Sequence, residues 1–150
     1  MSAEKHQVKV ASYVIFEREG KILVARRFNT GYMDGKYQMP SGHIESQEYP
    51  AEAAIREAKE EVGVDIRLED LEFVHVAYRV KNLAVQSSDY AAFFFRARKW
   101  EGEPTNKEPE KCDDLAWFTY DALPENVAPP IKHVLESLAR GELYSEYGRS

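Results

Sequence analysis

Three glutamates at helical spacing place the strongest constraint on how this chain can fold. Glu57, Glu60 and Glu61 stand at positions i, i+3 and i+4, so they share one face of any helix that includes them. On an isolated helix, like charges at this spacing repel by roughly a few tenths of a kcal/mol per pair. The apolar residues of segment 50–63 recur on a separate face. The segment therefore predicts an amphipathic helix that packs on one side and presents carboxylates on the other.

The glutamates belong to a longer pattern of fixed spacing. Gly42 precedes Glu48 by five intervening residues, and after seven more comes the run REAKEEVGV at 56–64. The seven fixed positions of this pattern would fall into register by chance on the order of once in 10^8 starts at average residue frequencies. Pro50 suits the first position of the helix, and Gly63 suits its end. We therefore interpret 42–64 as one functional unit, a loop followed by a helix.

A divalent cation explains why the three glutamates are grouped. Ions of the magnesium type prefer oxygen ligands, usually one or two carboxylates completed by water and substrate phosphate. Glutamates on one helical face, opposite a glycine loop that exposes main-chain carbonyls, match that preference. Such ions bridge phosphate oxygens and orient a nucleophilic water molecule. The pattern predicts a site for Mg²⁺ or Mn²⁺ that acts on a phosphate-containing substrate.

The rest of the chain predicts strands around this helix, followed by one more helix. Apolar alternation and turn signals predict strands at 9–16, 22–25, 37–39, 71–80, 89–98 and 115–119, with loops at 28–36, 82–88 and 100–114. A second amphipathic helix is expected after Pro129 and Pro130, ending at Gly141. This order predicts a mixed β-sheet between helices, an α/β/α sandwich, as a single domain over 1–150. Residues 1–6 and 145–150 are expected to fray.

Composition excludes several other classes of protein. The formal net charge of −6 argues against binding of a nucleic-acid polymer, although a small anionic ligand remains compatible if metal ions invert the local field. The single Cys112 excludes an internal disulfide and a multi-cysteine zinc site, which predicts a reducing, cytoplasmic location. The first ten residues lack the apolar core of a secretory signal, and no apolar run approaches the roughly eighteen residues of a membrane span. The expected partner is a small nucleotide.

The spacing of Gly42, Glu48 and the 56–64 run resembles the Nudix box, the signature of a superfamily that hydrolyses nucleoside diphosphates linked to another moiety. Ala58 departs from the pattern, because it is small where the family usually carries a larger apolar residue. The resemblance implies a Nudix-type fold and a metal-dependent pyrophosphohydrolase. It also implies a metal-ligand set made of the carboxylates of Glu57, Glu60 and Glu61 and the carbonyl of Ser41. In the same pattern Arg56 pairs with Glu48 and holds the loop against the helix.

Two segments outside the box are similar to the MutT-like branch of that superfamily. The sequence WEGEP at 100–104, followed by Lys107 and Glu108, resembles a loop of that branch and implies Glu108 as a further metal ligand or as the base that activates water. A solvated charge run is the alternative for Glu108. The sequence VARR at 24–27 resembles a strand whose last arginine contacts the nucleotide, which implies Arg27 as a substrate-binding residue.

Further substrate-binding candidates come from the loops. MutT-like members place a base-reading asparagine near 123–127, where a gapless match gives Val127 and leaves Asn126 one residue away. Asn126 is therefore a candidate, and a preference for oxidised guanine is left open. Tyr32 and Tyr37 lie near the glycine loop and are candidates for stacking on a base. The alternatives to Arg27 are Arg79, Lys81 and Lys36.

These observations predict a hydrolase that converts a nucleoside triphosphate into a monophosphate and pyrophosphate. The proposed catalytic residues are Glu57, Glu60, Glu61 and Glu108. One alternative is a pyrophosphatase for ADP-ribose or another nucleotide sugar. A second is a non-catalytic nucleotide-sensing module, against which the complete glutamate set argues. Both a monomer and a homodimer are compatible with the sequence.

Overall fold

The longest strand, β1 (Lys9–Arg18), lies at the centre of the sheet because both of its faces are apolar. In the computed structural model, which describes residues 5–82 and 88–149, the six successive residues 11–16 are buried. Tyr13 and Ile15 belong to one hydrophobic core, whereas Val14 and Phe16 belong to the other. A strand buried on both faces requires a layer on each side of the sheet.

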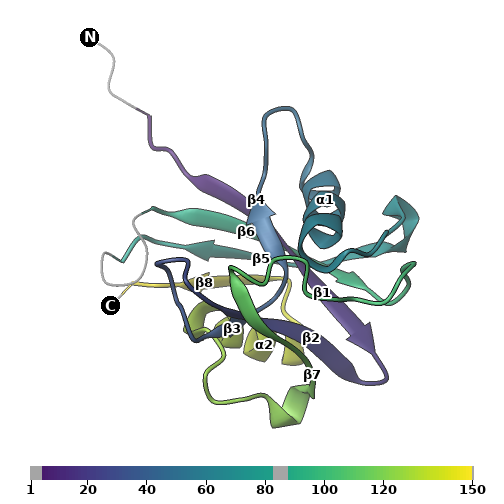
Figure 1. The fold of residues 1–150 in the computed structure, drawn as a ribbon. Helices are drawn as coiled ribbons and strands as arrows, with labels where there is room; N and C mark the ends of the chain where they lie inside the picture. The colour runs from purple at the N-terminus through teal and green to yellow at the C-terminus, as the bar shows by residue number, and fades with distance from the viewer. Residues whose placement is uncertain (1–4, 83–87, 150) are drawn as a thin grey trace.

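The other elements surround β1 in a mixed sheet (Figure 1). The remaining strands are β2 (Lys21–Arg27), β3 (Tyr37–Gln38), β4 (Ser41–His43), β5 (Leu71–Arg79), β6 (Tyr90–Ala97), β7 (Cys112–Thr119) and β8 (Tyr144–Tyr147). The helices are α1 (Pro50–Val62) and α2 (Pro129–Ala139), with 3-10 turns η1 (Leu68–Asp70) and η2 (Tyr120–Ala122). The main strand order is β3-β2-β1-β6-β5-β8, while β4 pairs with β1 and β7 pairs with β2.

The sheet divides beyond the β1–β2 hairpin. The two strands pair only next to their turn, through Glu17 with Ile22 and Arg18 with Lys21. Farther from the turn, β1 pairs in parallel with β6 and antiparallel with β4, whereas β2 pairs with β7 and β3. The short strand β4 thus enters between the two halves, directly before the loop that leads to α1.

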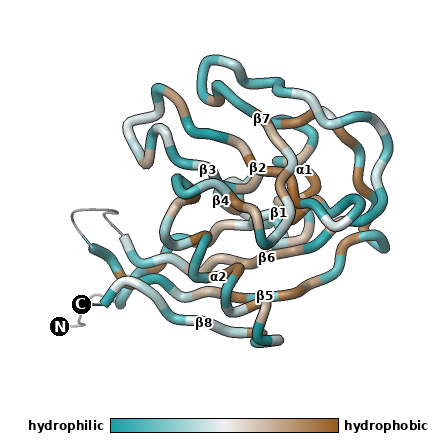
Figure 2. Tube along the Cα trace, turned by 90° about the horizontal axis from the view of Figure 1, so that it is seen from below, coloured by the Kyte–Doolittle hydropathy of each residue, from teal (hydrophilic) through white to brown (hydrophobic). Residues whose placement is uncertain are grey.

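One α-helix covers each face of the sheet, as Figure 1 shows. Ala54, Ala58 and Val62 of α1 pack with Phe16 in one core. Ile131, Val134 and Leu135 of α2 pack in the other core. The hydropathy-coloured trace shows apolar stretches within the strands and helices (Figure 2). This arrangement confirms the predicted α/β/α architecture. No helix in the described residues has the length and apolarity needed to cross a membrane.

The limits of α1 agree with the sequence signals. Pro50 occupies the first helical turn, and Gly63 ends the helix in the left-handed conformation at φ 77°. The side chain of Glu52 accepts a hydrogen bond from the backbone N–H of Tyr49 at 2.8 Å, which caps the first turn. The hydroxyl of Ser12 donates to the carbonyl of Pro50 at 2.7 Å and ties the start of α1 to β1.

The C-terminal segment departs from the expectation of fraying. Residues 144–147 form β8, which pairs in parallel with β5. The buried His75 explains the order of this strand, because its Nε2 lies 2.7 Å from the hydroxyl of Ser145 and its Nδ1 lies 2.9 Å from the carbonyl of Glu142. The frayed ends expected at 1–4 and 150 lie outside the described residues. Two further differences are β4, which was not predicted, and β7, which begins at Cys112 rather than at 115.

Candidate functional site

A cleft of about 580 Å³ opens where the two halves of the sheet separate. Its walls come from β1, β2, β4, α1, the adjacent ends of β5 and β6, the 28–36 loop and the loop that precedes β7. A cleft of this size is within the range of small-molecule sites. Of the residues predicted as site residues, the structure places the following in the lining: Arg27, Tyr32, Ser41, Gly42, Glu57, Glu60, Glu61 and Glu108. Tyr37 and Asn126 are not in that lining.

The side chain of Glu57 lies so close to Gly42 that no side chain would fit at position 42. A Cβ atom built on Gly42 would lie 2.0 Å from Oε1 of Glu57 and 2.1 Å from its Cδ. The missing side chain is therefore what lets the carboxylate of Glu57 lie against β4. Only glycine accommodates this close approach between a backbone and a functional side chain.

Arg56 holds the loop after β4 against α1. Its guanidinium donates to both carboxylate oxygens of Glu48, at 2.8 Å and 3.0 Å, and to the carbonyl of His43 at 3.0 Å. It also donates to Oε1 of Glu57 at 2.6 Å. The bond from Arg56 is the largest influence on the pKa of Glu48, which it lowers. The predicted pair of Arg56 with Glu48 is thus present as a bidentate ion pair, and it also orients Glu57.

Glu61 is the most deeply buried of the acidic side chains in the cleft. Its Oε2 accepts a hydrogen bond from the backbone N–H of Ser41 at 3.1 Å. Burial raises the pKa of Glu61 well above its usual value, and the negative charges of Glu57 and Glu108 raise it further. The N–H of Ser41 and the positive charge of Arg27 act in the opposite direction. Glu61 is therefore a carboxylate held where its own negative charge is unfavourable without a cation.

Glu57 and Glu60 differ in their exposure although they lie on the same helix. The Glu57 side chain is 13% exposed, and burial raises its pKa, opposed by Arg56 and assisted by the charges of Glu60 and Glu108. The Glu60 side chain is 54% exposed and lies 3.4 Å from Nη1 of Arg56. The acidic face predicted for α1 thus runs from the interior of the cleft to its mouth.

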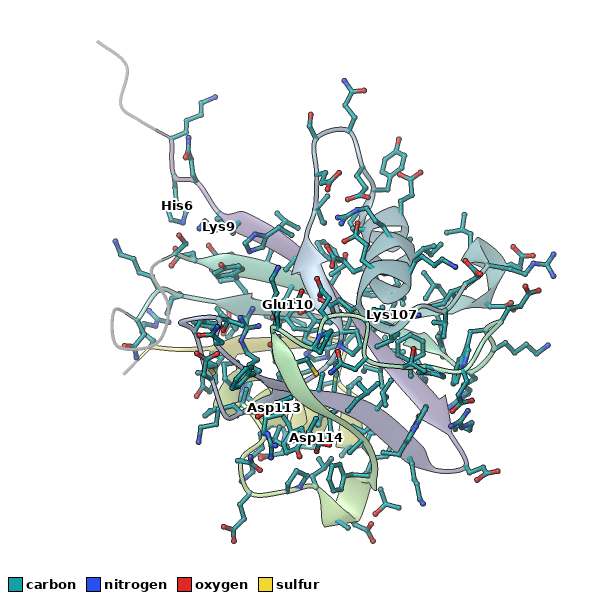
Figure 3. All side chains as sticks on the ribbon, viewed as in Figure 1. His6, Lys9, Lys107, Glu110, Asp113 and Asp114 are labelled. Atoms are coloured by element: carbon teal, nitrogen blue, oxygen red, sulfur yellow. The ribbon has the colours of Figure 1, made fainter. Side chains whose placement is uncertain are left out.

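The loop before β7 brings Glu108 to the same end of the cleft. Its backbone is attached to the end of α1, since the N–H of Lys107 donates to the carbonyl of Glu61 at 3.0 Å. The side chain of Asn106 accepts from the N–H of Glu108 at 3.0 Å and donates to the carbonyl of Cys112 at 2.7 Å. Figure 3 labels Lys107 and Glu110 on this loop. The Glu108 side chain lines the cleft and is close enough to raise the pKa of Glu57 and Glu61.

The donor set suits a hard divalent cation completed by other ligands. Carboxylates whose pKa is raised by burial and mutual repulsion gain stability when a cation offsets their charge. Among residues 5–82 and 88–149, no three His, Cys, Asp or Glu side chains converge into a ready-made metal cage. Magnesium does not require one, because it usually keeps several waters and takes oxygens from substrate phosphate. The residues present fit an ion that is bound together with its substrate.

Arg27 and Tyr32 form the wall that faces the glutamates. The Nε of Arg27 donates to the carbonyl of Tyr32 at 2.5 Å, and its Nη2 donates to the hydroxyl of Thr30 at 3.0 Å. The guanidinium lies 5.2 Å from the centre of the Tyr32 ring. These contacts hold the 28–36 loop beside the cleft. Both residues line the cleft, and their contact with a substrate stays a prediction.

The structure corrects the expectation for Tyr37. The residue is 6% exposed, its hydroxyl donates to the carboxylate of Asp114, and its ring meets Phe118 edge to face. Figure 3 labels Asp114 on β7. Tyr37 alternates onto the core-facing side of β3 and therefore cannot stack on a base in the cleft.

Asn126 is also placed differently from what the sequence suggested. Its side-chain amide donates to the carbonyl of Gly35 at 2.9 Å, and its own carbonyl accepts from the N–H of Tyr37. Asn126 thus anchors the 28–36 loop from outside the cleft. The expected role in reading a base does not fit this position.

Arg79, which the sequence offered in place of Arg27 for substrate contact, does line the cleft together with Tyr13 and Tyr90. Both tyrosines were missed by the sequence interpretation. Tyr13 lies in an apolar strand, where an aromatic residue usually indicates core packing, and Tyr90 follows a polar loop. The hydroxyl of Tyr13, a polar atom on a strand buried on both faces, was the signal from which its place in the cleft could have been inferred. Lys36 and Lys81, by contrast, are exposed and are not in the cleft lining.

Comparisons with known proteins match the chain to one family and to solved structures of the same fold. The family model of the NUDIX domain matches residues 5–138. An 8-oxo-dGTP diphosphatase of Escherichia coli (strain K12) is 28% identical over 124 residues, covering 83% of this chain and 89% of that protein. An RNA pyrophosphohydrolase of Bartonella quintana (strain Toulouse) is 30% identical over 141 residues, covering 81% of each chain. The crystal structure of a MutT NUDIX hydrolase from Burkholderia pseudomallei superimposes with a TM-score of 0.78 at 26% identity, covering 87% of this chain and 98% of that one.

Proposed function

Given that this chain belongs to the Nudix family and is a hydrolase of nucleotide pyrophosphate bonds, we propose that its substrate is a nucleoside triphosphate. The products are the nucleoside monophosphate and pyrophosphate. The proposed cofactor is Mg²⁺ or Mn²⁺. The proposal is supported mainly by one observation, the grouping of Glu57, Glu60, Glu61 and Glu108 at one end of a cleft of about 580 Å³.

In the proposed site, the chain's own residues position the reacting groups. Glu57, Glu61 and the carbonyl of Ser41 would hold the ion from inside the cleft, and Glu60 would complete the set from its mouth. When bound, the divalent ion offsets the charge of the phosphates and lowers the pKa of a water molecule. Arg56 keeps the carboxylate of Glu57 in place through its bond of 2.6 Å, so its role is positioning.

Glu108 is the proposed proton acceptor or outer ligand. It belongs to a loop whose backbone is hydrogen-bonded to the end of α1, and this attachment holds Glu108 near the glutamates of α1. Arg27 lies across the cleft and is the proposed contact for a phosphate oxygen. Positioning and charge neutralisation supply most of the catalysis in such a displacement, so no serine or cysteine nucleophile is needed.

The rival substrates are distinguished by their products. Cleavage of a triphosphate between the α and β phosphorus atoms releases inorganic pyrophosphate, whereas cleavage of ADP-ribose or another nucleotide sugar releases two phosphorylated organic products. The relatives include proteins named 8-oxo-dGTP diphosphatase and RNA pyrophosphohydrolase. The formal charge of −6 favours a small nucleotide over a polymer. Because Asn126 lies outside the cleft, a preference for oxidised guanine is not part of the proposal.

The test is a screen of nucleoside triphosphates and nucleotide sugars with Mg²⁺ or Mn²⁺, reading pyrophosphate, phosphate and organic products separately. We expect pyrophosphate release from triphosphates that stops when the ion is chelated. Glu61→Gln should lower the rate by about two to four orders of magnitude while the circular dichroism spectrum is unchanged. Turnover of nucleotide sugars alone would replace the proposed substrate class, and ligand binding without turnover of any compound would support the sensing module instead.

A further inference from the structure

Arg79 is a buried cation at the end of β5, in the wall of the cleft. The residue is 5% exposed and lines the cleft. Within residues 5–82 and 88–149, no carboxylate forms an ion pair with it, and its Nε is buried without a hydrogen-bond partner. Its Nη2 donates to the hydroxyl of Tyr13 at 2.9 Å. Arginine has five N–H donors and no acceptor, so much of its bonding capacity is unused in the described part of the chain.

A buried charge in this condition needs an explanation. Buried charged groups are normally paired, because removal from water is costly when no partner replaces the water. The rings of Tyr13 and Tyr90 lie 5.7 Å and 5.2 Å from the guanidinium carbon and offset part of that cost. Neither ring supplies an oxygen acceptor to the unused donors. A bound ligand that presents an acceptor would do so.

The surroundings of Arg79 are aromatic rather than acidic. Tyr13, Tyr90 and Tyr32 all line the cleft near it. The guanidinium of Arg27 lies 5.2 Å from the centre of the Tyr32 ring. The positive charge of Arg79 also lowers the pKa of Tyr32, against the larger, opposite effect of burial. The positive charge of Arg27 also opposes the rise in the pKa of Glu61. The cleft therefore runs from a carboxylate end, past Arg27 and Tyr32, to an end made of phenol rings and one guanidinium.

We propose that Arg79, oriented by the hydroxyl of Tyr13, is a specificity-determining residue, which donates a hydrogen bond to an exocyclic carbonyl of the nucleotide base held beside Tyr32 and Tyr90. The inference rests on the proposed function, since it assigns the nucleotide base to the second half of the same cleft. The predicted class of substrate is a nucleotide with an oxo base, such as hypoxanthine, guanine or uracil. Nucleotides of adenine and cytosine, which carry an amino group at the corresponding position, are the disfavoured class.

The discrimination follows from the donor-only character of arginine. A carbonyl accepts from the guanidinium, whereas an exocyclic amino group directs a donor at a donor and leaves both groups without partners in a buried site. Sites that hydrogen-bond one substrate group reject the analogue that lacks it much more strongly than apolar pockets do. The flat rings alone would hold either base, because stacking is tolerant of base identity. Selectivity is therefore assigned to Arg79 and affinity to Tyr32 and Tyr90.

The experiment compares substrates that differ chiefly at this exocyclic group. We expect wild-type kcat/KM to favour inosine triphosphate over ATP, and UTP over CTP, by about tenfold or more. Arg79→Met should bring both ratios close to one, mainly by lowering the values for the oxo bases. Arg79→Lys keeps the charge but loses the planar fork, and its ratios should be intermediate. If the Met variant does not fold, the Lys variant provides the test. Arg67→Met is the matched control, since Arg67 is exposed and pairs with Glu69 away from the cleft.

A binding arm separates this inference from the proposed function. Calorimetric titration of inosine and adenosine monophosphates requires no turnover, and we expect the same preference and the same loss in Arg79→Met. Preference in binding without triphosphate hydrolysis would uphold Arg79 while overturning the proposed substrate class. Hydrolysis of triphosphates with equal kcat/KM for the matched pairs would overturn the inference alone. Equal losses for both bases in the Arg79 variants, or no binding of either monophosphate, would also overturn it.

Discussion

The carboxylate of Glu57 occupies the space that a side chain on Gly42 would fill. A Cβ atom at position 42 would lie 2.0 Å from Oε1 and 2.6 Å from Cγ of Glu57. Real atoms cannot approach so closely, and the neighbouring backbone of β4 is paired with β1. The glycine of the sequence pattern is therefore explained by a contact between β4 and the acidic face of α1.

Gly42→Ala should displace the carboxylate of Glu57 and lower kcat/KM by about 10- to 100-fold, which is typical when a group that orients a metal ligand is changed. The measurement is metal-dependent pyrophosphate release, with thermal unfolding in parallel. Gly20→Ala is the matched control. Gly20 has φ 75° in the β1–β2 turn and nothing near its Cβ position, so its variant should lose stability and keep activity. Full activity of Gly42→Ala would contradict the assigned role of Glu57.

Arg56→Lys should reduce both activity and stability. Lysine cannot form the bidentate pair with Glu48 while also donating to Glu57 and to the carbonyl of His43. We expect the free energy of unfolding to fall by about 1–3 kcal/mol, because the Arg56 side chain is only 23% exposed. Glu48→Gln separates the two effects, since it weakens the loop but leaves the bond to Glu57. A larger loss of activity in Glu48→Gln than in Arg56→Lys would oppose the positioning role of Arg56.

The carboxylate end of the cleft was predictable because its information is local. Glu57, Glu60 and Glu61 lie on one helix, and the spacing to Gly42 and Glu48 fixes the loop that faces them. The helix limits and the α/β/α architecture followed from turn signals and apolar periodicity in the same way. The spacing along the chain therefore predicted those site residues that lie on one helix or on the loop that leads into it.

At the aromatic end, Arg79 was offered only as an alternative, and Tyr13 and Tyr90 were missed, because their meeting depends on register between distant strands. Tyr13, Arg79 and Tyr90 come from three strands, and only the pairing of β1 with β6 and of β6 with β5 brings them together. Tyr37 was wrongly expected in the cleft, because the phase of a two-residue strand cannot be read from its sequence. The strand β8 was missed for a similar reason, since its order depends on the contact between Ser145 and His75.

Metal binding should stabilise the folded protein. The ion would offset repulsion among buried carboxylates that no other cation relieves fully, so Mg²⁺ or Mn²⁺ at about 100 times its Kd should add about 2.7 kcal/mol. For a chain of this length, that corresponds to a rise in Tm of roughly 5–10 °C in differential scanning fluorimetry. Glu61→Gln should lose most of this rise, and its metal-free Tm should equal or exceed that of the wild type. A metal-induced shift of normal size in Glu61→Gln would remove Glu61 from the ligand set.

Stability should depend on pH through Glu17, far from the cleft. Burial alone would raise the pKa of Glu17, but hydrogen bonds from Tyr120 and Arg98, both at 2.9 Å, outweigh it and lower the pKa below its usual value near 4.5. Burial and the same bond raise the pKa of Tyr120 to about 12. A folded-state pKa that is lowered means that ionised Glu17 stabilises the fold above the unfolded-state pKa. This contribution is lost as the pH falls through the folded-state value.

We therefore expect Glu17→Gln to lower the free energy of unfolding by about 1–2 kcal/mol at pH 7 and by much less at pH 3. Urea unfolding at the two pH values measures the difference. Glu19→Gln is the control, because Glu19 is exposed in the adjacent turn and should show no such difference. An equal effect of Glu17→Gln at both pH values would show that the loss comes from packing rather than from charge.

Glu108→Gln tests whether the loop before β7 takes part in the reaction. The Glu108 side chain is 31% exposed and lines the cleft, whereas Glu110, two residues later, is exposed and is not in its lining. If Glu108 accepts a proton or completes the ligand set, its amide variant should lower kcat by about 10- to 100-fold, less than the loss in Glu61→Gln, because the inner ligands remain. Glu110→Gln removes the same charge from the same loop and should leave kcat unchanged. Steady-state kinetics of the two variants at saturating metal gives the comparison. If both variants lowered kcat equally and only slightly, Glu108 would be a solvated loop residue with no part in the reaction. An equal effect would mean that only the total negative charge of the loop matters, and not which of the two side chains enters the cleft.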